Sequence, residues 1–97
     1  MNYIVYPTKE HVVFPEKGYF QKGDKGTSIL LISTFLAFNF VGYEVKTGVA
    51  IDDMLGDYFG PNLEKWVKEF QRANGLTVDG GIGPITYNKL KEYGFNG

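Results

Sequence analysis

The sequence of 97 residues contains no cysteine, a single histidine and a single arginine. Without cysteine, the chain cannot form a disulfide, a zinc site with cysteine ligands or a thiol nucleophile. The one histidine, His11, excludes a metal site built from several histidines, and we expect neither a metal ion nor another cofactor. The formal net charge is only -1 and Arg72 is the sole arginine, so we expect no nucleic acid as a partner.

Long apolar runs are also absent. The most apolar stretch, residues 29–41, is interrupted by Ser33, Thr34 and Asn39, so we expect no membrane insertion. No basic region followed by an apolar run opens the chain, and we therefore expect no signal peptide. Aromatic residues, in contrast, make up 16% of the sequence. This content suits a dense core or a surface that binds carbohydrate, and the length allows one small domain.

Glycine and proline predict where helices begin and end. Pro61 and Pro84 each follow a glycine. Proline is favoured at the first helical position, because the N–H that it lacks would have no partner there. Gly75 and Gly94 stand where glycine commonly ends a helix. With apolar residues at helical spacing, these signals predict helices at residues 28–39, 61–74 and 84–93, the first capped by Thr27 or Ser28.

The first twenty residues read as an arm. Residues 3–6 and 12–14 have the composition of strands and could pair as a hairpin. A two-stranded hairpin alone is marginally stable in water, so the arm must pack on the domain, join the sheet of a partner or serve as a linker. The predicted helix at residues 28–39 is apolar on every side, and such a helix is usually covered all round. Our hypothesis is that the arm covers its extra face.

One stretch, from Phe59 to Leu90, carries a set of short motifs in the order FG, VxxFQ, GL, VDG and GPxT. In this order and spacing they resemble the peptidoglycan-binding domain found beside catalytic domains in bacterial and phage cell-wall hydrolases. The resemblance extends upstream with less force and covers Gly23 to Tyr93. It implies a mainly α fold, a closed three-helix bundle with a short extended or hairpin N-terminal arm. The arm or linker would be residues 1–22 and the domain residues 23–97.

The sequence departs from the family's pattern at several places. Ser33 stands where glutamine is common, and Trp66 stands where a small residue is preferred; we expect Trp66 to be packed rather than displayed. Gly56-Asp57 reverses the usual order of these two residues. Gly42-Tyr43 ends the first helix in the family manner. The connection that follows is longer than expected, and we predict an extended piece at residues 49–51 and one helical turn at 52–55.

The resemblance implies a non-catalytic module that binds bacterial peptidoglycan, through either the glycan strand or the stem peptide, and targets a phage or bacterial hydrolase to the cell wall. A covalently linked catalytic domain is the second expected partner. With no signal peptide visible, the protein would be phage-encoded and released at lysis. Sugars and peptides are bound in shallow grooves by aromatic faces with a few amides, hydroxyls and charges. Residues of these types supply the candidate ligand-binding set: Tyr43, Tyr58, Asn62, Gln71, Arg72, Asn74, Asp79, Thr86 and Tyr87.

Several of these candidates could instead stabilise the fold. Gln71 could tie a loop carbonyl, Asp79 is a common turn former, and Thr86 could bond the first turn of its helix. Catalysis by the acids at Asp52-Asp53, Asp57 and Glu64 is disfavoured, because charged side chains are mostly solvated and unpaired. The main alternative function is a structural or interaction protein that reuses this fold for protein–protein docking. A further alternative is an inhibitory pro-segment, but its thiol switch would need a cysteine, which the chain lacks. The last alternative is a small glycosidase or amidase.

Overall fold

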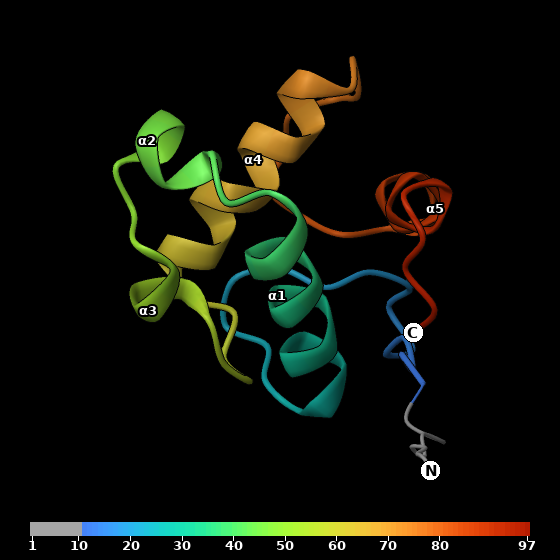
Figure 1. Ribbon diagram of the computed structural model, residues 1–97. Helices are drawn as coiled ribbons and strands as arrows, with labels where there is room; N and C mark the ends of the chain where they lie inside the picture. The colour runs from blue at the N-terminus through green and yellow to red at the C-terminus, as the bar shows by residue number, and fades with distance from the viewer. Residues whose placement is uncertain (1–10) are drawn as a thin grey trace, which may run out of the picture.

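A computed structural model describes residues 11–97, and five helices make up its ordered secondary structure. Figure 1 shows α4 passing α1, with α2 and α3 on one side and α5 on the other. Residues 11–97 contain no β-strand, so the prediction of a mainly α fold is confirmed. None of the helices in this part of the chain has the length and apolarity that a membrane crossing requires. The helices are α1 (Thr27–Asn39), α2 (Tyr43–Thr47), α3 (Ile51–Met54), α4 (Pro61–Ala73) and α5 (Pro84–Glu92).

The three longer helices, α1, α4 and α5, are those that the glycine and proline signals predict. Pro61 and Pro84 each occupy the start of their helix, behind a glycine with extended backbone. The predicted cap of α1 is wrong, because Gly26 holds that position. The hydroxyl of Ser28 accepts a hydrogen bond from the backbone N–H of Val13 at 2.8 Å instead. Ser28 therefore ties α1 to the segment before it.

The two short helices α2 and α3 fill the long connection between α1 and α4. Tyr43 does not end the first helix, as predicted, but begins α2. The prediction of an extended piece at residues 49–51 is wrong at Ile51, because Ile51 begins α3. The helical turn predicted at residues 52–55 is present as α3, one residue earlier than expected. Polar side chains explain this folding: Glu44 Oε2 accepts from the backbone N–H of Ile51 at 2.8 Å. Thr47 Oγ1 donates to the carbonyl of Tyr43 at 2.6 Å.

The described part of the arm packs beside α5. The ring of Phe14 stacks on Phe20, with centroids 5.0 Å apart, and meets Tyr87 edge-on at 5.1 Å. Phe20 forms an isolated antiparallel bridge with Ile82. The other half of the predicted hairpin, residues 3–6, lies outside the described residues. Residues 12–14 form no strand within the described chain.

The end of the chain covers part of the extra apolar face of α1; whether the arm covers more of it stays a prediction, because residues 1–10 lie outside the described residues. Phe35 packs against Phe95, with ring centroids 5.1 Å apart. Leu30 and Phe38 remain exposed. Of the described arm, Val13 contacts the first turn of α1 through Ser28, and His11 lines a pocket together with Leu31 and Phe35 of α1.

The core lies where α1 and α4 meet the turns that precede α4 and α5. Trp66 is completely buried, as predicted for a packed residue, and its indole N–H donates to the carbonyl of Val49 at 3.0 Å. This bond connects α4 to the segment between α2 and α3. The largest fully buried apolar side chains are Ile29, Ile32, Leu36, Phe59, Leu63, Trp66, Val67, Phe70, Ile82 and Leu90.

Candidate functional site

Three of the predicted ligand-binding residues bond to one another: Gln71 and Thr86 are buried, and Asp79 joins them from the surface. Gln71 is 1% exposed and projects from α4 toward the turn before α5. The two N–H groups of its Nε2 are shared among three acceptors: Oδ1 of Asp79 at 2.9 Å, the carbonyl of Gly81 at 2.8 Å and Oγ1 of Thr86 at 3.1 Å. Its Oε1 accepts from the backbone N–H groups of Asp79 and Gly80, at 3.1 Å and 2.9 Å. One amide thus holds the whole turn.

The geometry of this turn explains why its residues are of these types. Gly80 has φ of 79°, and a Cβ there would lie 2.9 Å from Cγ of Glu64. The carboxylate of Asp79 also accepts from the N–H of Gly81 at 2.9 Å. Gln71 is buried and fully bonded, so it presents no free surface to a ligand, whereas Thr86 is 6% exposed and lines a surface pocket with Asp79. Both residues support the turn that leads into α5.

A buried side chain of α1, Ser33, also holds a turn by hydrogen bonds to its backbone. Ser33 is fully buried in α1, and its Oγ donates to the carbonyl of Gly56 at 2.8 Å. The same oxygen accepts from the N–H of Gly56 at 3.1 Å. Ser33 therefore does for the turn before α4 what Gln71 does for the turn before α5.

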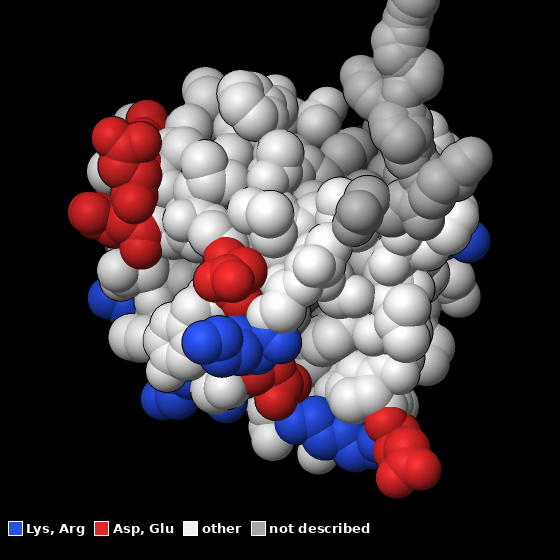
Figure 2. Space-filling model, turned by 90° about the horizontal axis from the view of Figure 1, so that it is seen from below, with Lys and Arg blue, Asp and Glu red and all other residues white. Residues whose placement is uncertain are grey.

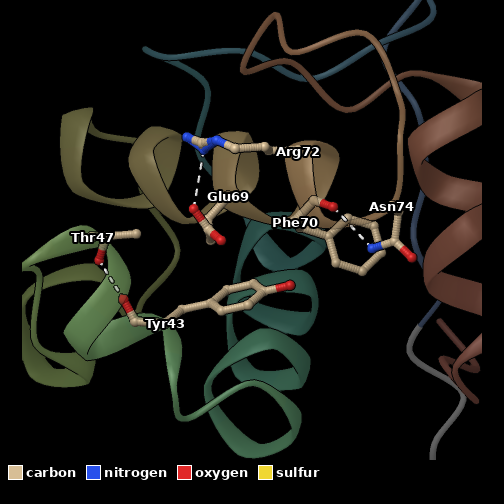
Figure 3. A network of polar contacts seen from close by, with 6 residues as sticks. All are labelled: Tyr43, Thr47, Glu69, Phe70, Arg72 and Asn74. Carbon is tan, nitrogen blue, oxygen red and sulfur yellow. Dashed lines mark hydrogen bonds and ion pairs between the residues drawn. The ribbon is translucent and has the colours of Figure 1, made fainter.

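Three other predicted residues gather on one face, which we call the aromatic face. Figure 3 shows Tyr43 of α2 beneath Glu69 and Arg72 of α4, with Asn74 at the end of that helix. Arg72 Nη1 lies 3.1 Å from Oε1 of Glu69, and the Arg72 side chain is largely exposed. The hydroxyl of Tyr93, which follows α5, donates to Oδ1 of Asn74 at 2.7 Å. The aromatic face consists of Phe40, Tyr43, Glu69, Arg72, Asn74 and Tyr93.

Tyr43 is the most strongly perturbed ionisable group of this face. Its ring is half-buried, stacked on Phe40 at 5.2 Å and edge-on to Trp66 at 5.6 Å. Burial, followed by the negative charge of Glu69 and the nearby Tyr93, raises the pKa of Tyr43 to about 12. At neutral pH the hydroxyl is therefore a protonated group that can donate a hydrogen bond.

The raised pKa of Tyr43 predicts a loss of stability in alkali. The unfolded chain has the ordinary value of 10.0, so it releases the phenolic proton before the folded protein does. The contribution of Tyr43 is complete below pH 10 and should be lost as the pH rises toward about 12. Urea unfolding across this range should show a steeper fall for the wild type than for Tyr43→Phe, which has no proton to lose. Equal slopes would contradict this assignment.

The two remaining surface candidates, Tyr58 and Asn62, line a groove between α3 and α4. The groove has a volume of about 370 Å³ and is lined by residues 53–58 and 60–63; we call it the α3–α4 groove. Tyr58 is 54% exposed. Asn62 Nδ2 donates to the carbonyl of Asp53 at 3.1 Å, which ties the two walls together.

Asp53 and Asp57 of this groove were considered from the sequence only as catalytic acids, and neither belongs to the predicted ligand-binding set. Both are exposed, and both line it. Figure 2 shows acidic side chains gathered at the edge of the molecule where Figure 1 draws α3. Their position just before the aromatic turn is the signal that could have found them. Tyr87, by contrast, packs between Phe14 and Phe95 and joins neither surface.

Comparisons with known proteins give one result for this chain. Residues 37–90, more than half of the sequence, match the model of a family described as "Putative peptidoglycan binding domain". This stretch begins near the end of α1 and includes α2, α3, α4 and most of α5. It therefore contains the whole α3–α4 groove, the Gln71 network and the aromatic face except Tyr93. A comparison with curated proteins found no match.

Proposed function

The chain belongs to the peptidoglycan-binding domain family, and from this premise we propose that it is a non-catalytic module that attaches a hydrolase or a phage protein to murein. The observation that carries the proposal is the family match over residues 37–90, which includes both surface sites. The domain would span residues 23–97, and a covalently linked catalytic domain would be its working partner. Its place of action would be the cell wall, after release at lysis if a phage encodes it.

The mechanism is adsorption through modest contacts to a repeating polymer. Shallow surfaces bind weakly, but linkage to a second module raises the effective concentration of each at its target. On the aromatic face, the guanidinium of Arg72 suits a carboxylate of the stem peptide, because it can present paired N–H donors. Tyr43 and Asn74 would add a hydroxyl and an amide elsewhere on the same face, although the Asn74 amide is bonded to the Phe70 carbonyl and to Tyr93.

The nine predicted residues then divide by role. Those at the surface would contact the polymer, and those in the network would hold the turns that shape it. The contacting residues would be Tyr43, Tyr58, Asn62, Arg72 and Asn74. The supporting residues would be Gln71, Asp79 and Thr86, while Tyr87 would anchor the arm.

Purified bacterial sacculi provide the test. A fluorescent fusion of the full chain should sediment with sacculi, while the fluorescent partner alone should stay in solution. The proposal fails if the fusion stays in the supernatant although circular dichroism shows a folded helical protein. If that protein is also an obligate oligomer by analytical ultracentrifugation, the docking alternative gains support, since Phe38 of α1 is exposed.

A further inference from the structure

The α3–α4 groove has one wall formed by a fixed aromatic ring. A Cβ at Gly60 would lie 3.0 Å and 3.2 Å from Cε2 and Cδ2 of Tyr58, so the ring rests against the Gly60 backbone. The chain beneath the ring is also fixed. Tyr58 bridges Lys25, and the N–H of Phe59 donates to the carbonyl of Asp24 at 2.7 Å. Tyr58 therefore presents an exposed face whose position is set before a ligand arrives.

The rim of the groove offers hydrogen-bond acceptors. Asp53 and Asp57 are exposed there, and no ion pair involves either of them among residues 11–97. Asn62 uses its Nδ2 on the Asp53 carbonyl, which leaves its Oδ1 as a third acceptor. A ligand for this groove needs several donors and one broad apolar face.

A sugar ring meets both requirements, because its C–H face packs on an aromatic ring while its hydroxyl and acetamido groups donate. The stem peptide fits less well, since its terminal carboxylate would be repelled by Asp53 and Asp57. The positive end of α4, at Pro61, also borders the groove, but its roughly half charge is smaller than that of two carboxylates. We infer that the α3–α4 groove takes the glycan strand of peptidoglycan, with one sugar ring against Tyr58. This inference rests on the proposed function.

Competition for sacculi separates the two parts of the polymer. Sacculi digested with an amidase yield soluble glycan strands and free stem peptides, which can be purified and added separately to the sedimented complex. In the variant Arg72→Ala, which lacks the proposed stem-peptide contact, glycan strands should displace the full-length protein and stem peptides at the same concentration should not. Displacement by stem peptides alone would overturn the inference and leave the proposed function standing. If the protein does not bind intact sacculi at all, both the proposed function and the glycan inference are wrong.

Variants of Tyr58 and Tyr19 test whether the glycan strands bind in the α3–α4 groove. Tyr58→Ala should weaken binding of the glycan strands about tenfold, which corresponds to about 1.4 kcal/mol of lost contact. Tyr58→Phe keeps the ring and should bind nearly as well as the wild type. Tyr19→Ala removes another exposed tyrosine outside the groove and should bind unchanged. If Tyr58→Ala binds the strands as tightly as Tyr19→Ala does, the groove is not their site.

A charge variant adds an independent check. Asp57→Asn keeps an acceptor but removes the charge, and it should bind glycan strands within about threefold of the wild type while stem peptides gain affinity. Asp52→Asn is the matched control, because Asp52 is exposed on α3 but does not line the groove. A loss of glycan binding for both variants alike would show that general charge, rather than the groove, governs adsorption.

Discussion

Replacing Gln71 with alanine should destabilise the protein by about 3 to 5 kcal/mol, a large part of the stability of a small domain. The side chain is buried and serves three acceptors and two backbone donors. Its removal leaves the N–H of Gly80 and the carbonyl of Gly81 without their partner and opens a cavity beside Thr86. Urea unfolding followed by circular dichroism measures the loss.

The neighbouring Arg72 provides the control for this effect. Its side chain is 59% exposed, and although the Glu69 side chain is only 13% exposed, an ion pair with one partner in solvent contributes little. Arg72→Ala should therefore change stability by no more than about 0.5 kcal/mol. Gln71→Glu keeps the shape but loses the amide donor, and it should also be strongly destabilised. If Gln71→Ala unfolds at the same urea concentration as Arg72→Ala, the network does not hold the turn.

Replacing Trp66 with alanine should have an effect of similar size, about 3 to 5 kcal/mol. Trp66 is the largest fully buried side chain, and its ring lies edge-on to Tyr43. Its N–H also holds the carbonyl of Val49, so its loss should loosen the connection between α2 and α3 as well as the core. Denaturant unfolding gives the total loss, and hydrogen exchange of α2 and α3 reports the local part.

Trp66→Phe separates the contribution of ring packing from that of the hydrogen bond to Val49. This variant keeps an aromatic ring in the core but leaves the Val49 carbonyl without its donor, so the expected loss is about 1 to 3 kcal/mol. Amide protons of α2 should exchange faster in both variants. The assignment is contradicted if Trp66→Phe is as unstable as Trp66→Ala, because the hydrogen bond would then be the whole effect.

The sequence predicts the three longer helices well because their signals are local. Gly60-Pro61 and Gly83-Pro84 set the beginning of α4 and α5 from neighbouring residues alone. The short helix α2 has no such signal. Helices of its length are unstable by themselves, and α2 depends on contacts such as Glu44 with Ile51. Contacts of this kind appear only once the chain is folded.

The site was predicted less completely, for a related reason. The family motif picks out Gln71, Asp79 and Thr86 by their types, but a type does not show whether an amide is buried or displayed. The structure places the Gln71 amide inside, in a network with the other two residues. The α3–α4 groove arises where Asn62 meets Asp53, a tertiary contact across the start of α4 that no periodic pattern predicts.

The most direct test of the central claim is a binding isotherm of the folded full-length chain on purified sacculi, followed by digestion of the sacculi with a muramidase. The account predicts saturable binding and complete release of the protein into solution as the polymer is cut. A helical, monomeric protein that shows no saturable uptake at any sacculus concentration would contradict it.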